Sequence, residues 1–204
     1  MNALIEHFLQ NNRKEVLKDS IIHCHLKNVH SVMLLNSPGK MIRMFIAEPG
    51  NELWMNEPGT IVDNQSVAFH SHHCNLTLKC VYGEFTNRKL TEGNQEYIPS
   101  FKFQSHIKTG KGSFEKIGQK RIGFTLDETI KENQSIFLRA KDIHTIVTPK
   151  DAWAAWLVLE GKEDKNYDST CYSYKDLTKE KFTGLYQKMT ITKLNHLLKN
   201  IAIL

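Results

Sequence analysis

The stretch FHSHHCNLTLKCVYGEF, residues 69–85, decides how the rest of the chain is interpreted. From Leu76 onward it has the apolar texture of a β-strand. On a strand, side chains at positions i and i+2 point to the same side, so His70 and His72 can present two imidazole nitrogens to one metal ion at about 2.0–2.1 Å. His73 is expected to point away from that pair. The stretch therefore predicts a strand that carries half of a metal site.

Working outward, similar short apolar runs separated by turn residues extend from Ile21 to Gly161. Ser37-Pro38-Gly39 combines a proline that presets φ with a glycine that tolerates positive φ, so the runs on either side of it are predicted to pair as a hairpin. About ten candidate strands with no long helical pattern between them favour an antiparallel sandwich or barrel over a parallel βαβ fold.

The two ends of the chain have helical patterns instead. Apolar residues in the first segment recur at helical spacings with charged residues between them, which predicts an amphipathic helix. Near the other end, Thr178 is expected to cap a helix that continues through Tyr186, and a second apolar stripe follows. The predicted organisation is one mainly-β domain over residues 1–204, with an N-terminal helix over 1–19, a β-barrel over 20–165 and C-terminal helices over 176–204.

Two histidines supply too few ligands for a tight site, so a third is expected from another stretch. His144 lies in FLRAKDIHTIVTP, just before the predicted strand AWAAWLVLEG. A neighbouring antiparallel strand would bring it beside His70 and His72. The sequence thus predicts a triad of three imidazoles.

These residues resemble the cupin superfamily, whose first motif contains HxH followed by a glutamate and then a glycine. His70, His72 and Gly83 fit that spacing, and His144 lies where the second motif places its histidine. The resemblance covers roughly residues 41–161 and implies a cupin-type double-stranded β-helix, or jelly-roll barrel. The glutamate position falls on Leu76 or Thr77, and the proline and glycine that usually precede the second-motif histidine are replaced.

A cupin without that glutamate resembles the three-histidine subgroup that includes the thiol dioxygenases, among them cysteine dioxygenase. The resemblance implies iron(II) on His70, His72 and His144 and a small polar or thiol-containing substrate. Imidazole also suits zinc, nickel and copper, so the ligands do not select iron by themselves. Arg43 lies about as far ahead of the HxH as the arginine that binds the substrate carboxylate in cysteine dioxygenases, and a guanidinium can grip a carboxylate with two parallel hydrogen bonds.

Two aromatic residues are further candidates for substrate contact. Tyr82 shares strand parity with Leu76 and Leu78, and Trp156 lies on a strand near His144. The active-site tyrosine of cysteine dioxygenases has no counterpart after His144. The alternatives to a dioxygenase are a non-catalytic cupin that binds a metal or ligand for sensing or storage, and a cupin isomerase or epimerase.

A second HxH, His23-Cys24-His25, is a pattern that amidohydrolase-type enzymes place on their first strand. Their fold is a βα barrel of about 250 residues, which this chain does not resemble. Strand alternation instead places Cys24 and Leu26 inside and the two histidines outside.

Composition restricts the class of protein. A chain of 204 residues that is 40% hydrophobic and 24% charged is typical of a globular domain. Its net charge of +5 is dispersed, which favours a solvated surface over a nucleic-acid interface. No apolar run approaches the roughly 18 residues of a membrane span.

The four cysteines form no CxxC pair and no secretory signal is recognised, which predicts a cytoplasmic protein with reduced thiols. Cupins are often dimers, so the resemblance implies a possible homodimer.

Overall fold

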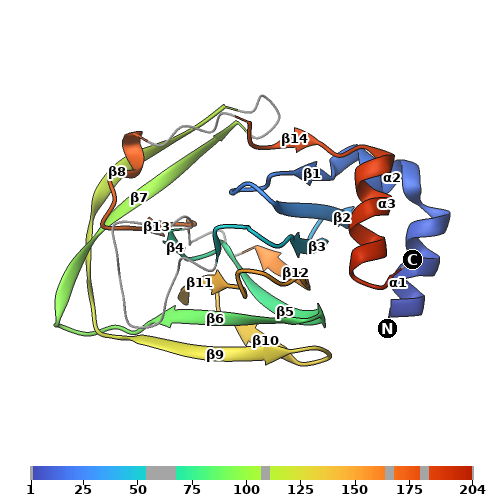
Figure 1. Cartoon of the computed structure of the whole chain (residues 1–204). Coiled ribbons are helices and arrows are strands. Elements are labelled where there is room, and N and C mark those ends of the chain that lie inside the picture. The colour runs from blue at the N-terminus through green and yellow to red at the C-terminus, as the bar shows by residue number, and fades with distance from the viewer. Residues whose placement is uncertain (1, 54–67, 107–110, 164–167, 180–183, 204) are drawn as a thin grey trace.

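Two antiparallel sheets of seven strands each make up most of the described part of this computed structural model (Figure 1). The structure describes residues 2–53, 68–106, 111–163, 168–179 and 184–203. Sheet A contains, in order, β10 (Ser135–Leu138), β5 (Cys74–Tyr82), β12 (Ala154–Glu163), β3 (Lys40–Ala47), β2 (Val29–Ser37), β1 (Ile21–Ile22) and β14 (Gln187–Lys188). Sheet B contains, in order, β8 (Lys111–Ile122), β7 (Glu96–His106), β13 (Cys171–Tyr172), β4 (Phe69–His70), β11 (Ile143–Val147), β6 (Glu84–Leu90) and β9 (Thr125–Lys131).

The strand pairing defines a jelly roll. β3 pairs with β12, β4 with β11, β5 with β10 and β6 with β9, so each pair lies inside the previous one along the chain. The first and third pairs belong to sheet A, and the second and fourth belong to sheet B. Nested antiparallel pairs shared alternately between two sheets are the jelly-roll topology, which cupins also have. The predicted mainly-β, cupin-type jelly-roll fold is confirmed.

Further strands widen both sheets. β2 and β3 form the predicted hairpin around Pro38 and Gly39, with Ser37 opposite Lys40 and Gly39 at φ 74°. A long hairpin of β7 and β8 extends sheet B away from the helices (Figure 1). β13 and β14 lie beyond residue 165, where the strand region was predicted to end, so that boundary is corrected. Each has only two residues, too few to show a periodic pattern.

Three α-helices lie at one end of the molecule, within the described residues: α1 (Asn2–Asn11), α2 (Arg13–Asp19) and α3 (Ile191–Asn200). The predicted N-terminal helix is present but is interrupted at Asn12, whose φ and ψ of −125° and 23° are not helical. The side chain of Thr190 caps α3 by accepting a hydrogen bond from the backbone N–H of Lys193 at 3.2 Å. No helix among the residues that the structure describes is long and apolar enough to cross a membrane.

The first predicted C-terminal helix is wrong in its described part. Thr178 lies in a short 3-10 helix, Leu177–Lys179, and Tyr186 has a left-handed φ of 55° just before β14. A non-glycine residue at positive φ cannot continue a right-handed helix. The residues between, 180–183, lie outside the described part of the chain.

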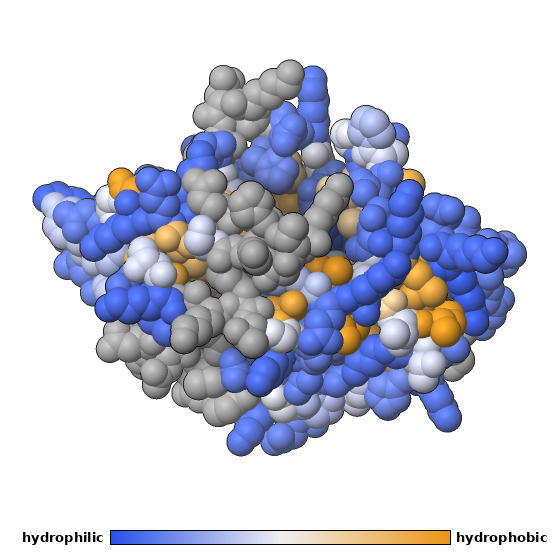
Figure 2. All heavy atoms as spheres, turned by 90° about the horizontal axis from the view of Figure 1, so that it is seen from above, coloured by the Kyte–Doolittle hydropathy of each residue, from blue (hydrophilic) through white to orange (hydrophobic). Residues whose placement is uncertain are grey.

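Two apolar clusters cover the two faces of sheet A. One consists of apolar side chains of the three helices packed on the outer face, including Leu9, Leu194 and Leu197. The other fills the space between the sheets and contains Phe85 and Trp156. Seen from above, hydrophilic residues cover most of the described surface, with smaller hydrophobic groups between them (Figure 2). Side chains of sheet A that belong to the second cluster therefore face sheet B, and those of the first cluster face the helices.

Candidate metal centre

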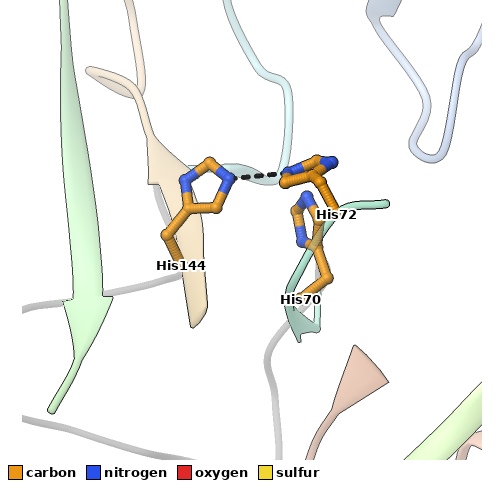
Figure 3. Close-up of side chains that lie close together, drawn as sticks. All are labelled: His70, His72 and His144. Carbon is orange, nitrogen blue, oxygen red and sulfur yellow. Dashed lines mark hydrogen bonds between the residues drawn. The ribbon is translucent and has the colours of Figure 1, made fainter. Parts of the chain in front are cut away.

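The three predicted histidines come together between neighbouring strands of sheet B. His70 on β4 lies directly opposite His144 on β11. His72 follows two residues later, where the chain passes from β4 in sheet B to β5 in sheet A. Figure 3 shows the three rings gathered around a common space. The strand register therefore places imidazoles from two separate stretches of chain in one cluster.

The distances between the rings suit a shared ion. The candidate ligand nitrogens of His70, His72 and His144 all lie within 4.8 Å of one another. The ring centroids are 4.8 to 5.2 Å apart. The Nε2 atoms of His72 and His144 face each other at 2.9 Å (Figure 3).

That short distance, drawn as a hydrogen bond in Figure 3, is also close enough for both nitrogens to bind one ion. Two nitrogens at about 2.1 Å from one ion lie about 3.0 Å apart if they subtend 90° and about 3.4 Å apart at the tetrahedral angle. The observed 2.9 Å between His72 and His144 agrees with the first value.

Hydrogen bonds at Nδ1 determine which ring nitrogen can bind a metal. His144 Nδ1 lies 2.8 Å from Asn87 Oδ1, and His70 Nδ1 lies 3.0 Å from the carbonyl oxygen of Ala68. Because these oxygens accept, each Nδ1 carries the proton and donates it, which leaves the Nε2 lone pair free for a metal. Partners of this kind orient metal-binding histidines and fix their tautomer.

Burial keeps the three imidazoles neutral. Only 3% of His144 is exposed, and His70 and His72 are half-buried. Removal from water lowers the pKa of all three, that of His72 to about 2, and the neighbouring imidazoles lower the pKa values of His72 and His144 further. The neutral form is the one that binds metals. The site is therefore ready to accept a cation without first losing protons.

Arg43 faces the interior but already has a partner. It lies on β3 two residues before Phe45, which stacks on Trp156 between the sheets. Its Nε is 3.5 Å from Glu160 Oε1, and its Nε and Nη2 lie 3.0 and 2.8 Å from the sulfur of Met41. Its role in substrate binding remains a prediction.

The two aromatic candidates occupy different places. Trp156 lies between the sheets, 4% exposed, with its ring against Phe45 at 5.7 Å and Phe85 at 5.5 Å. Tyr82 instead packs against the cluster under the helices, on the outer face of sheet A. The inward position of Tyr82 was predicted from the alternation of side chains along β5. A register shift between β5 and β12 near Ala155 breaks that alternation. The expectation that Tyr82 faces the site is therefore corrected.

The second HxH lies outside any strand. β1 ends at Ile22, and His23 and His25 both have positive φ, 55° and 66°, in a turn. Cys24 and Leu26 are buried and His25 is exposed, as predicted, although a turn and not a strand produces this pattern. His25 Nδ1 lies 2.9 Å from the hydroxyl of Tyr186.

Sequence reasoning missed two polar residues on β6 that contact or face the site. Asn87, 3% exposed, is the hydrogen-bond partner of His144. Lys89 pairs with His144 across the sheet, forms an ion pair with Asp142 at 2.9 Å and helps to lower the pKa of His144. In the sequence EFTNRKL, residues 84–90, no pattern indicates that Asn87 or Lys89 lies near His144, because their position depends on the register of β6 against β11.

Fold and site together define a mainly-β jelly-roll protein with a three-histidine cluster suited to a divalent metal ion. No protein-family model matches the chain, and no curated protein sequence matches it. Solved structures resemble it at low identity. The hydroxypropylphosphonic acid epoxidase from S. wedmorenis is 11% identical, with a TM-score of 0.39 over 70% of this chain and 56% of the epoxidase. The chain thus spans little more than half of that protein's length.

Two further structures are similar to the same extent. An RmlC-like cupin from Shewanella frigidimarina is 12% identical, with a TM-score of 0.37 over 68% of this chain and 80% of the other. A structure of DMSP lyases matches at 13% identity, with a TM-score of 0.36 over 71% of this chain and 52% of the other. At such TM-scores these likenesses carry no information about chemistry, which has to be argued from the residues of this chain.

Proposed function

We propose that the protein is a metal-dependent dioxygenase that holds iron(II) on His70, His72 and His144 and acts on a small polar or thiol-containing molecule. The observation that carries the proposal is the grouping of three imidazoles, whose candidate ligand nitrogens lie within 4.8 Å of one another, with His70 opposite His144 in the sheet. Bound there, iron(II) with open positions would supply the chemistry that joins molecular oxygen to a substrate.

The protein's own residues have distinct roles in this proposal. Asn87 keeps the proton of His144 on Nδ1 and so keeps Nε2 available. Trp156, stacked on Phe45, forms an apolar surface between the sheets that excludes water. These residues hold the ligands in place and keep the interior dry.

Arg43 is proposed to bind an anionic group of the substrate. Its Nε is 3.5 Å from Glu160 Oε1, longer than the 2.7–2.9 Å typical of a charge-assisted hydrogen bond. The contact with Glu160 is therefore weak, and a substrate carboxylate could compete with Glu160 for the guanidinium, which also contacts the sulfur of Met41. We further propose that the protein acts in the cytoplasm, which its four free cysteines support.

Anaerobic loading with iron(II), followed by measurement of oxygen uptake over a panel of small thiols and amino acids, tests the proposal. We expect substrate-dependent uptake by the wild type and none by His144→Ala. His196→Ala is the matched control, because His196 lies on α3 beside Trp153 and away from the cluster. Full iron occupancy without uptake on any substrate would contradict the proposal.

The second candidate function is a non-catalytic protein that binds the metal or a ligand. Trp156, packed between Phe45 and Phe85, already fills part of the space between the sheets. The missing motif glutamate at Leu76 or Thr77 points the same way. Retention of a metal with no product formed from any substrate would favour this function, and a measured product would exclude it.

A further inference from the structure

A second group of metal-binding side chains lies at the start of β5 and the end of β12. The candidate ligand atoms of His73, Cys74 and Glu160 all lie within 4.8 Å of one another, separate from the three-histidine cluster. His73 directly follows His72, so consecutive residues belong to the two groups. We propose that His73, Cys74 and Glu160 form a second metal site, which takes a divalent ion of the zinc class.

The donor set favours zinc over iron. The group combines an imidazole, a thiolate and a carboxylate, which are the three ligand types of protein-bound zinc. Thiolate is a soft ligand that selects zinc among the common divalent ions, whereas the three-histidine cluster offers imidazole alone. The second group therefore has a donor that favours zinc, the thiolate of Cys74, and the three-histidine cluster lacks it.

The local backbone brings a second carboxylate, that of Glu163, close to His73. Glu163 lies opposite Cys74 in the β12–β5 pairing, and its carboxylate is 3.7 Å from His73 Nε2. Residues three apart on a regular strand point to opposite sides of the sheet. A register shift between Glu160 and Glu163 breaks that rule, so both carboxylates reach the His73 and Cys74 region.

Charge and exposure also suit a cation. Two carboxylates, Glu160 and Glu163, face this region, and Arg43 Nε at 3.5 Å balances only one of them. Cys74 is 2% exposed, and burial together with the nearby Glu160 raises the pKa of its thiol to about 11, so an ion binding here would displace the thiol proton. The side chain of His73 is 45% exposed and leaves a route for the ion. A metal here would tie the start of β5 to the end of β12, immediately beside His72.

Cobalt(II), a spectroscopic substitute for zinc, tests the second site. A cobalt–thiolate bond produces a near-ultraviolet charge-transfer absorption that imidazole and carboxylate ligands lack. Titration of metal-free protein with cobalt(II) is expected to produce this band and zinc to abolish it. Cys74→Ser should remove the band, and Cys80→Ser should keep it, because Cys80 is a buried cysteine on the same strand and away from the group.

Two further variants make the test independent of folding and of the proposed function. His73→Ala alters a side chain that is 45% exposed, so the fold should survive, and the affinity for the cobalt that produces the band should fall by more than about tenfold. His144→Ala should keep the band while losing oxygen uptake. Absence of the band in the wild type, or its persistence in Cys74→Ser, would overturn the second site and leave the iron proposal intact.

Discussion

Replacing Asn87 with alanine removes the oxygen that accepts a hydrogen bond from His144. The two side chains are each 3% exposed, and the distance from Oδ1 to Nδ1 is 2.8 Å. Without this acceptor, the imidazole can turn and can carry its proton on Nε2, the atom that faces His72 at 2.9 Å. A protonated Nε2 cannot bind a metal.

The expected loss has two parts. Removal of a residue that orients a metal ligand typically weakens metal binding by about tenfold to a hundredfold. That change corresponds to about 1.4 to 2.7 kcal/mol of binding free energy. The metal-free protein should also lose about 1–3 kcal/mol in its free energy of unfolding, because His144 is left with a buried, unpaired N–H.

Competition with a chelator of known affinity measures the first part, and urea unfolding of the metal-free protein measures the second. Asn87→Asp should retain tight binding, because a carboxylate oxygen accepts the same hydrogen bond. Thr86→Ala, a change on the same strand whose hydroxyl contacts Thr129 at 3.0 Å, is the control and should bind metal normally. Wild-type metal affinity in Asn87→Ala would refute the role given to this hydrogen bond.

Three other changes test the fold around the site. Gly83→Ala is expected to destabilise the protein by about 2 kcal/mol or more in urea unfolding, because Gly83 has φ 67° and an added Cβ would lie 2.6 Å from the carbonyl oxygen of Trp153. Asp127→Ala should cost about 3 kcal/mol by the same measurement, since it leaves the fully buried Arg88 without the carboxylate that accepts two hydrogen bonds at 2.8 Å; a change below 1 kcal/mol would contradict this. Burial raises the pKa of Glu48, but hydrogen bonds from His30 and Lys193 outweigh burial and hold it at about 2, below the ordinary 4.5. A carboxyl group whose pKa is lower in the folded state than in the unfolded state stabilises the fold at pH values above the unfolded pKa. The difference in unfolding free energy between wild type and Glu48→Gln should therefore be largest at neutral pH and should shrink as the pH falls from 4.5 toward 2. A difference that does not change with pH would show that Glu48 is not stabilised in this way.

The antiparallel β-fold and the histidine pair could be predicted because both depend on local patterns, and the jelly-roll topology was implied by the resemblance to cupins. Alternation along short strands indicated an antiparallel β-fold, and the spacing of His70 and His72 needs only two residues of strand. His144 could be included because it stands just before another strand. Gly83, recognised by its spacing, joins β5 to β6 at a positive φ that glycine adopts without strain.

What could not be predicted depends on register and on irregular backbone. Asn87 reaches His144 only through the pairing of β6 with β11. The inward position expected for Tyr82 failed at a register shift that adds a residue to β5, and no sequence pattern marks that shift. The helix expected through Tyr186 failed because tertiary contacts stabilise a left-handed residue there and a two-residue strand after it.

The nested order of the strands affects when the three imidazoles can act together as ligands for an ion. His144 follows His72 by 72 residues in the chain. A ribosome adds about 5–20 residues per second, so roughly 4–14 s separate the synthesis of the two ligands. During that interval the nascent chain offers only the first pair of imidazoles. Binding of an ion by all three imidazoles would therefore require β11 to have been made and to have paired with β4.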